Sequence, residues 1–244
     1  EFLPISSSGH LILAREIFGI SLVNSLAFDA VLQFATTLAV VLYFWRDLWA
    51  LLFVRDKKNN TLLTAIVVGT IPAAVVGFLF ESQIDAFFRN ANTVAWALIA
   101  GSALFFAAEK YAARAQSSLQ DSTQVSVLKS FWIGCFQALA FIPGMSRSGS
   151  TISGGLFLGL KREDAVRFSF LLSVPILLGS GLKKLLDING TGGIDMPLVA
   201  ACLAAFVAGL VSIHILILYL RRHTLNVFIV YRVILAIVIL LTLY

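Results

Sequence analysis

Six apolar segments, each close to the length that crosses a lipid bilayer, recur along this chain and limit what it can fold into. The hydrocarbon core of a bilayer is ~30 Å thick, and a helix that crosses it needs about 20 residues. Only 13% of the residues are charged, whereas a soluble domain carries about 25%. The sequence therefore predicts an all-α fold, a polytopic transmembrane helical bundle. The segments cover residues 26–45, 62–80, 94–108, 165–186, 198–220 and 227–244.

Charge and cysteine content exclude other classes of protein. The net charge is +5, but the basic residues lie in short tracts between apolar segments, where they set membrane topology. We therefore expect no nucleic acid partner. The two cysteines, Cys135 and Cys202, lie in apolar runs and are expected to be small core residues, not a disulfide. Residues 1–244 are predicted to form a single integral membrane domain in contact with membrane lipids.

Two further stretches carry a proline followed by a Ser/Gly cluster, and together they indicate an internal duplication. The first reads FLPISSSG over residues 2–9, and the second reads FIPGMSRSG over residues 141–149. The second has one extra residue after the proline. Beyond it, an offset of 140 relates Ser6 to Ser146, Ser8 to Ser148, Gly9 to Gly149, Phe28 to Phe168 and Gly69 to Gly209.

The basic tracts predict how the two halves are oriented. By the positive-inside rule these tracts are cytoplasmic, and three crossings then separate the two Pro-Ser/Gly elements. We therefore predict two inverted-topology repeats, residues 1–112 and 127–244, joined by a cytoplasmic linker at 113–126. Irregular backbone at membrane depth needs protein or a cavity around it, so each element is predicted to be a re-entrant helix hairpin whose tip meets the other. The basic tracts are 46–58, 110–129, 161–167 and 221–222, and the connections 81–92 and 187–196 hold only one basic residue, Arg89.

The second element has the features of a phosphate-binding loop. Arg147 offers a planar fork of donors that matches phosphate oxygens. Gly144 and Gly149 allow backbone N–H groups to approach an anion closely. Thr151 and the residues after it resemble a helix start, whose N-terminus adds partial positive charge. Because an arginine at membrane depth is costly, we favour a functional role for Arg147 over a structural one.

The first element offers reactive groups. A serine hydroxyl becomes a nucleophile once a base takes its proton, and His10 lies three residues after Ser7. His10 is a candidate base, general acid or nucleophile. Glu1 is a candidate ligand for a divalent cation, Mg²⁺ or Ca²⁺, because hard cations prefer oxygen ligands. The competing interpretation is structural, since most Ser-rich turns are helix caps and most lone membrane histidines are hydrogen-bonded structural residues.

Three other polar residues fall within apolar segments. Asp29 and Gln33 are four residues apart, on one face of a predicted helix, and we expect them to support the site from outside it. Arg232 either pairs with a carboxylate or lines a cavity, and the sequence favours neither.

Two motifs resemble the signatures of a known bacterial family. Residues 1–10, EFLPISSSGH, resemble the first signature of the undecaprenyl-diphosphatase family, which is also known for bacitracin resistance. Residues 143–151, PGMSRSGST, resemble its second signature, a P-G-x-S-R-S-x-x-T pattern. The similarity runs over essentially the whole chain. Two long motifs in the right order are far more specific than either motif alone.

The resemblance implies an activity and a location. The family removes one phosphate from undecaprenyl pyrophosphate and so recycles the carrier lipid for cell-wall synthesis. Its members lie in the bacterial inner membrane, need a divalent cation and often form homodimers. Their active site is thought to open to the periplasmic side.

The motif match also implies roles for particular residues. Glu1 carries over as the second acid of an E-x-x-x-E pair, Ser7 and His10 as nucleophile and base candidates, and Arg147 as the pyrophosphate clamp. The first acid would precede Glu1 by four residues, so we expect the natural chain to begin further upstream. Ser8 stands where many members have threonine. The predicted substrate-binding residues are Ser6, Ser8, Gly9, Ser146, Ser148, Gly149 and Thr151.

Our hypothesis is that Ser7, with His10 assisting, attacks the terminal phosphorus while Arg147 holds the phosphates. Direct attack by water with His10 as base is nearly as well supported. The main alternative function is a secondary transporter with the same inverted-repeat fold, and a lipid flippase is a third. The histidine beside a triple serine favours hydrolysis, because transport needs neither a nucleophile nor a base.

Overall fold

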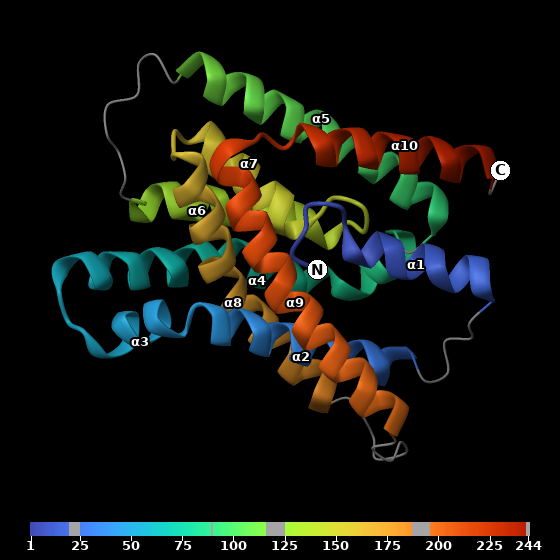
Figure 1. Cartoon of the computed structure of the whole chain (residues 1–244), viewed down its shortest axis with the longest axis horizontal. Helices are drawn as coiled ribbons and strands as arrows, with labels where there is room; N and C mark the ends of the chain where they lie inside the picture. The colour runs from blue at the N-terminus through green and yellow to red at the C-terminus, as the bar shows by residue number, and fades with distance from the viewer. Residues whose placement is uncertain (20–24, 89, 116–124, 187–195, 243–244) are drawn as a thin grey trace.

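The computed structural model describes residues 1–19, 25–88, 90–115, 125–186 and 196–242. This part of the chain contains ten α-helices, one 3-10 helix and no strand (Figure 1), which confirms the all-α prediction. The elements are α1 (Ser7–Phe18), α2 (Ser25–Tyr43), α3 (Trp45–Phe53), α4 (Lys57–Phe88), α5 (Ala91–Ala115), α6 (Val127–Ala138), η2 (Leu139–Phe141), α7 (Arg147–Phe157), α8 (Arg162–Leu186), α9 (Met196–Arg222) and α10 (Asn226–Thr242).

Four helices are long and apolar enough to cross a membrane, and all four fall on predicted segments. They are Lys57–Phe80, Ala91–Ala115, Arg162–Leu182 and Leu198–Arg222. The predicted segment 227–244 forms α10, a shorter apolar helix of 17 residues. The prediction of a polytopic helical membrane protein therefore agrees with the length and composition of these helices.

The predicted segment 26–45 was expected to form one straight span. Its apolar run is continuous, but the helix is broken near its end. Leu32–Tyr43 and Trp45–Phe53 are bent by 72° relative to each other. Phe44, at the break, is 5% exposed, and its ring lies 5.6 Å from the ring of Phe170 on α8. The chain is anchored to the core at Phe44, and it changes direction there. Hydropathy alone gives no signal of such an anchor.

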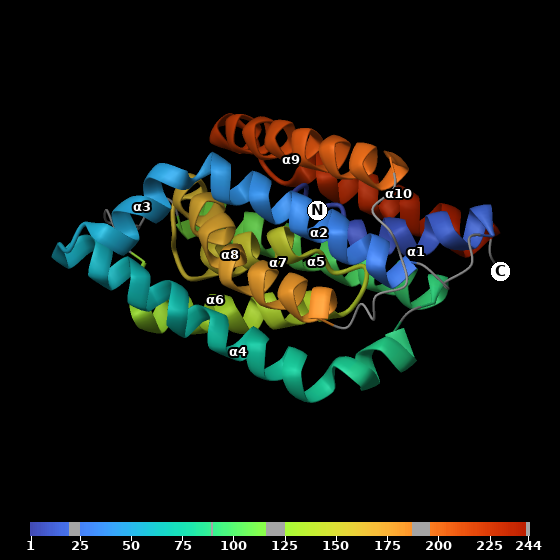
Figure 2. The ribbon, with the colours of Figure 1, turned by 90° about the horizontal axis from the view of Figure 1, so that it is seen from below.

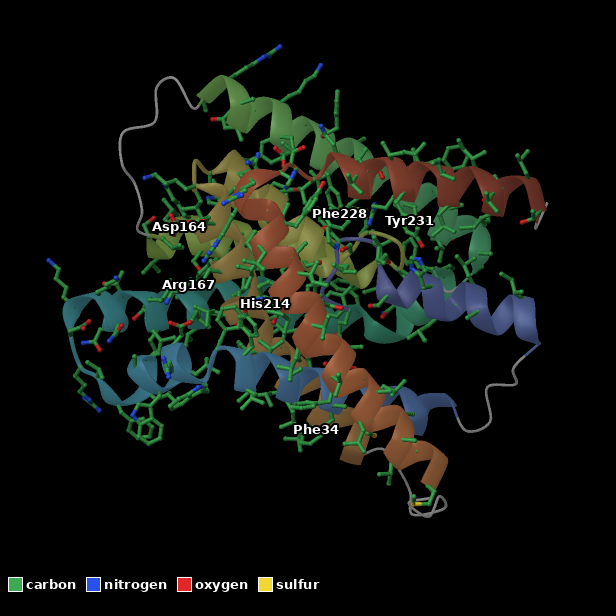
Figure 3. The ribbon with its side chains drawn as sticks, in the orientation of Figure 1. Phe34, Asp164, Arg167, His214, Phe228 and Tyr231 are labelled. Atoms are coloured by element: carbon green, nitrogen blue, oxygen red, sulfur yellow. The ribbon has the colours of Figure 1, made fainter. Side chains whose placement is uncertain are left out.

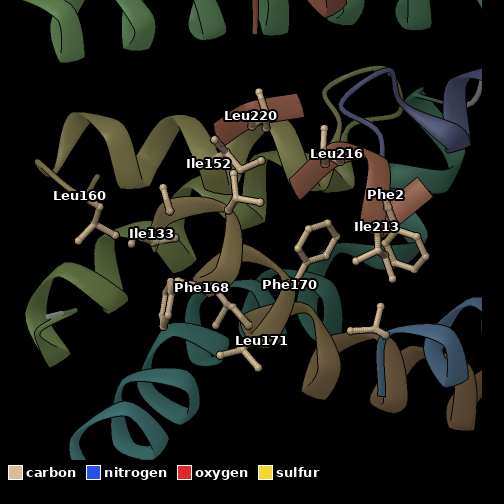
Figure 4. Packing of buried hydrophobic residues seen from close by; sticks show 14 of the residues in the cluster. Phe2, Ile133, Ile152, Leu160, Phe168, Phe170, Leu171, Ile213, Leu216 and Leu220 are labelled. Carbon is tan, nitrogen blue, oxygen red and sulfur yellow. The ribbon is translucent and has the colours of Figure 1, made fainter. Parts of the chain in front are cut away.

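α7 and α8 lie at the centre of the molecule, between α4 on one face and α9 on the other (Figure 2). Within its candidate span α8 is 61% buried, against 22% for α4 and 17% for α9. Apolar side chains that remain exposed on α4 and α9 suit a surface that faces lipid. The apolar core around the central helices includes Phe2, Ile133, Ile152, Phe168, Phe170, Leu171, Ile213, Leu216 and Leu220 (Figure 4).

α4 and α6 approach each other closely through small residues. A Cβ atom placed on Gly134 would lie 2.1 Å from the carbonyl oxygen of Gly69. Beside this contact, the Ser130 hydroxyl donates a hydrogen bond to the carbonyl of Ala65. In lipid, helices associate through dispersion and hydrogen bonds, and small residues permit both. This contact holds α6, and the loop that follows it, against the bundle.

Ion pairs gather the basic tracts at one end of the molecule. The two exposed pairs contribute little stability, and Glu109 in the third is buried, but together the pairs bring the ends of four helices close to one another. Arg167 marks this end in Figure 3. The pairs are Arg167 with Asp47, Arg162 with Glu109 at 2.5 Å, and Arg221 with Glu163 at 3.2 Å.

Candidate active site

The two Pro-Ser/Gly elements adopt the same backbone conformation at corresponding positions. Ser6 and Ser146 have φ angles of 69° and 72°, and within the described ranges they are the only non-glycine residues with positive φ. Ser6 directly precedes α1, and Ser146 directly precedes α7. Each hydroxyl accepts a hydrogen bond, 3.4 Å long, from the N–H of the glycine three residues later, Gly9 or Gly149. These caps satisfy part of each helix start, but a left-handed serine costs roughly 1–2 kcal/mol, so surrounding contacts must hold both loops.

The two loops are in direct contact with each other. The Ser6 hydroxyl accepts a second hydrogen bond, 3.0 Å long, from the backbone N–H of Gly144. Gly144 has a φ of 108°, and a Cβ atom on it would lie 2.6 Å from the Cβ of Ala97 on α5. Only glycine fits at this close approach to α5. Gly144 therefore lets the second loop lie against the first.

This contact brings Glu1 next to Arg147. Glu1 Oε1 lies 3.8 Å from Arg147 Nη2, and the side chains are 21% and 15% exposed. Glu1 Oε2 accepts a hydrogen bond, 2.5 Å long, from the hydroxyl of Thr36 on α2. Arg147 Nη2 is buried and has no hydrogen-bond acceptor in the described part of the chain, although buried donors nearly always have one. An anion at the start of α7 would find this donor free, together with the N-terminal end of the helix.

His10 is held by hydrogen bonds at both ring nitrogens. Nδ1 lies 2.7 Å from the carbonyl oxygen of Ser6, and because a carbonyl only accepts, Nδ1 carries the proton. Nε2 lies 2.6 Å from the hydroxyl of Tyr231 on α10, and the two rings stack with a centroid distance of 5.8 Å. A neutral His10 therefore accepts a hydrogen bond from Tyr231 at Nε2. Figure 3 labels Tyr231 on α10.

The predicted Ser7–His10 pair is not formed in this conformation. The Ser7 side chain is partly exposed and makes no hydrogen bond to His10 or to any other group in the described ranges. Its hydroxyl is therefore available to a ligand. His10 would reach it only after leaving Tyr231.

The predicted substrate-binding residues divide into an accessible and a buried set. Ser8 is exposed, whereas the other six are buried: Ser6, Gly9, Ser146, Ser148, Gly149 and Thr151. The Thr151 hydroxyl donates to the carbonyl oxygens of Arg147 and Ser148, at 2.9 and 3.1 Å, and contacts the hydroxyl of Ser169 on α8. Thr151 thus holds α7 to α8. The predicted helix start at Thr151 was wrong by one turn, because Ser146 caps α7 and the helix begins at Arg147.

Two residues on α10, Tyr231 and Arg232, belong to this region and were not predicted as site residues. In the described chain Arg232 pairs with no carboxylate, and it is completely buried, so neither predicted role applies to it. The signal that identifies it is an arginine inside an apolar segment. Gln33 donates to the hydroxyl of Ser180 at 2.5 Å, and the side chain of Asp29 lies outside the described residues.

Glu1 fits a divalent cation only as a partial ligand. No group of three or more His, Cys, Asp or Glu side chains gathers anywhere in the described ranges. Mg²⁺ commonly binds through one or two carboxylates together with phosphate oxygens of a substrate. One carboxylate, bound to Thr36 and next to the Arg147 guanidinium, suits that arrangement.

Comparisons with known proteins agree with both motifs and with the length of the chain. A sequence profile of the family described as bacitracin resistance protein BacA matches residues 1–238. The protein named undecaprenyl-diphosphatase from Elusimicrobium minutum is 39% identical to this chain, over 99% of this chain and 92% of its own length. The protein of that name from Moorella thermoacetica is 40% identical, over 97% of this chain and 90% of its own length. The protein of that name from Mycolicibacterium smegmatis is 40% identical over 98% of this chain and 90% of its own.

Proposed function

The chain belongs to the BacA family of bacitracin resistance proteins, and from this membership we propose that it is an undecaprenyl-diphosphatase. It hydrolyses undecaprenyl pyrophosphate to undecaprenyl phosphate and inorganic phosphate. The relatives that carry this name match nearly the full length of the chain. The observation in the molecule that best supports the proposal is a buried guanidinium nitrogen of Arg147 that has no hydrogen-bond acceptor in the described ranges. It lies 3.8 Å from Oε1 of Glu1, the acid of the first loop.

The site is proposed to lie within the membrane, between two inverted repeats. Support comes from the matching conformation of Ser6 and Ser146 at an offset of 140 and from the contact between the two loops. α7 leads on to the basic end of the molecule at Arg162, whereas α1 runs toward the opposite end (Figure 1). If the basic end is cytoplasmic, the bacterial inner membrane holds the protein and the site opens to the periplasmic side.

Substrate binding is proposed to centre on Arg147. Its guanidinium takes the phosphates as a bidentate fork, and the N-terminal ends of α1 and α7 add partial positive charge from two directions. A divalent cation held by Glu1 and the phosphate oxygens would neutralise negative charge as the anhydride breaks. The undecaprenyl tail leaves the site toward the lipid-facing helices.

The chemical step is proposed to begin at Ser7. Its oxygen bonds to the terminal phosphorus, the phosphoanhydride bond breaks, and undecaprenyl phosphate leaves with the bridging oxygen. His10 Nε2 takes the Ser7 proton once the imidazole has left the Tyr231 hydroxyl. Water then hydrolyses the phosphoserine and releases inorganic phosphate. Positioning and electrostatic stabilisation provide most of the acceleration.

A second route, supported by the unassembled Ser7–His10 pair, is direct attack by water. His10 then deprotonates the water, and no covalent intermediate forms. Rapid acid quench with a substrate labelled in the terminal phosphate separates the two routes. Label that is bound covalently to the wild-type protein but not to Ser7→Ala supports the serine route. A Ser7→Ala variant that keeps at least about a tenth of the wild-type rate supports water, because loss of a true nucleophile costs far more.

The decisive experiment is phosphate release from a long-chain prenyl diphosphate by purified protein in nanodiscs. Arg147→Ala should lower kcat/KM by about 10²- to 10³-fold, the usual effect of removing a group that stabilises developing charge. Arg167→Ala, which breaks an ion pair at the basic end, is the matched control and should keep full activity. Full activity in Arg147→Ala would overturn the proposal.

The transporter and flippase alternatives make different predictions in the same preparation. Either would bind the prenyl diphosphate without releasing phosphate, and a flippase would move labelled lipid across a liposome bilayer. None of the named relatives is called a transporter. Absence of hydrolysis together with lipid movement would favour the flippase.

A further inference from the structure

Arg232 is a buried cation that no carboxylate in the described ranges compensates. It lies on α10 with 0% of its surface exposed and is among the largest fully buried side chains. In the described chain none of the ion pairs includes it. Burying an unpaired charge costs several kcal/mol unless hydrogen bonds replace the lost water. Its surroundings must therefore supply those bonds.

The compensation comes from oxygen atoms on three segments. Nη2 donates to the carbonyl of Gly144 at 2.9 Å, and Nη1 lies 3.5 Å from the carbonyl of Pro4. These two carbonyls belong to the two loops of the site. α5 supplies the remaining contacts: the carbonyls of Leu98 and Ala97, at 3.2 and 3.5 Å from Nη2, the Ser102 hydroxyl, at 3.2 Å from Nε, and the Phe105 ring, whose centroid lies 4.6 Å from Cζ.

The space for this guanidinium is matched to its shape. A Cβ atom on Gly101 would lie 2.1 Å from Arg232 Nη2, so α5 can take the side chain only where it has a glycine. A planar fork donates in several directions at once, whereas a lysine ammonium is a single point. Gly101 and Arg232 therefore form a matched pair.

We propose that Arg232 is a positioning residue that sets the distance between the two loops and, through it, the distance between Glu1 and Arg147. Pro4 lies three residues after Glu1, and Gly144 lies three residues before Arg147. Arg232 acts through the backbone of both loops and does not touch the substrate. The part of this inference that concerns catalysis rests on the proposed function, but the link between the loops does not.

The first test measures the link itself, by hydrogen exchange of the protein in nanodiscs. In Arg232→Gln, exchange in the peptides that cover residues 1–10 and 139–149 should rise by at least about tenfold relative to peptides of α8, because local opening follows loss of buried contacts. Arg162→Gln is the control, since it removes a bond to Glu109 two turns further along α5 than Ser102. Loops as protected as in the wild type in Arg232→Gln would overturn the proposal.

The second test measures catalysis in the same variants. A misplacement of about 1 Å can lower the rate by about 10²-fold, so Arg232→Gln should lower kcat by that order. Arg232→Lys should lower it less. Arg162→Gln should lower the melting temperature with kcat unchanged, which separates positioning from general stability. A loss of kcat in Arg162→Gln equal to that in Arg232→Gln would contradict the positioning role.

Two further variants keep the inference testable if Arg232→Gln does not fold. Gly101→Ala displaces the guanidinium without changing charge, and Ser102→Ala removes one acceptor. Both should raise exchange in the two loops, Gly101→Ala more than Ser102→Ala, and unchanged exchange in Gly101→Ala would overturn the proposal. If the wild-type protein does not hydrolyse prenyl diphosphates, the proposed function fails while the exchange result still decides the role of Arg232.

Discussion

The two Pro-Ser/Gly loops share a backbone conformation and differ in how they are packed. Ser6 and Ser146 have nearly the same φ and the same capping bond. Behind the second loop, every residue of α7 from Ser148 to Leu156 is buried. Behind the first, α1 exposes Leu11 and Ile17, at 40% and 66%. The same local structure therefore lies once among buried residues at the centre of the molecule and once at its edge.

The same comparison separates two kinds of chemistry. At the offset of 140, Ser7 corresponds to Arg147 and His10 to Ser150. In the proposed mechanism the central loop presents the cation that holds an anion, and the peripheral loop presents the groups that exchange protons. A fixed cation gains from a rigid setting because it is already oriented before charge develops, whereas the proposed role of His10 requires it to move between partners. The predictions below test this division between the two loops.

The largest expected difference concerns the glycines after the two capping serines. A Cβ atom on Gly149 would lie 1.9 Å from the buried ring of Phe105, whereas on Gly9 it would lie 3.0 Å from a methyl group of Val94. Gly149→Ala should destabilise the protein by about 3 kcal/mol, as overpacking in a rigid core does, and Gly9→Ala by less than about 1 kcal/mol. Thermal unfolding in detergent measures both, and equal losses would show that the loops are equally rigid.

The next difference concerns the corresponding residues His10 and Ser150. His10→Gln should lower kcat by about 10²-fold, the usual contribution of a general acid or base. Ser150 is fully buried, and its hydroxyl has no hydrogen-bond partner in the described ranges. Ser150→Ala should therefore raise the unfolding free energy by about 1 kcal/mol and leave kcat unchanged. A loss of rate in Ser150→Ala would mean that the central loop also takes part in proton transfer.

The sequence predicted much of this arrangement, for physical reasons that also explain what it missed. Bilayer thickness fixes helix length, so α4, α5, α8 and α9 were predictable from hydropathy. The offset of 140 indicated two related loops because a capping serine and the glycine three residues after it recur at that offset. The bend at Phe44 was not predictable, since it depends on a ring packed against α8.

Contacts between distant side chains were the other part that the sequence did not supply. His10 and Ser7 are three residues apart and share a helix face, which suggested a pair, but the imidazole is bound to Tyr231, 221 residues away. Arg232 stood out as an intramembrane charge, yet most of its hydrogen-bond partners are backbone carbonyls, which no pattern of side chains reveals. Both contacts arise from α10, whose packing against α1 and α5 is a tertiary property.

The next prediction concerns the hydrogen bond that holds His10 in its resting position against Tyr231. Tyr231→Phe removes the hydroxyl 2.6 Å from His10 Nε2 but keeps the stacked ring. In the proposed mechanism His10 must leave this hydroxyl before it takes a proton, so we expect kcat to rise by up to about tenfold, or ~1.4 kcal/mol, for the loss of one good hydrogen bond, with KM unchanged. The matched control is Tyr43→Phe, which removes a hydroxyl that bonds a different histidine, His214. A similar change of rate in both variants, or a lower rate in Tyr231→Phe, would contradict this role of Tyr231.

The smallest expected effect concerns the threonine that supports each loop. Thr36 binds the carboxylate of Glu1, whereas Thr151 ties α7 to α8 through three contacts. Thr36→Val should raise the half-saturating concentration of divalent cation about threefold, because a carboxylate that loses an orienting partner binds a cation less well. Thr151→Val should leave that concentration and the KM for substrate unchanged while it lowers the melting temperature. A raised KM in Thr151→Val would instead place its hydroxyl in contact with the phosphates, and the central loop would then bind substrate through more than Arg147.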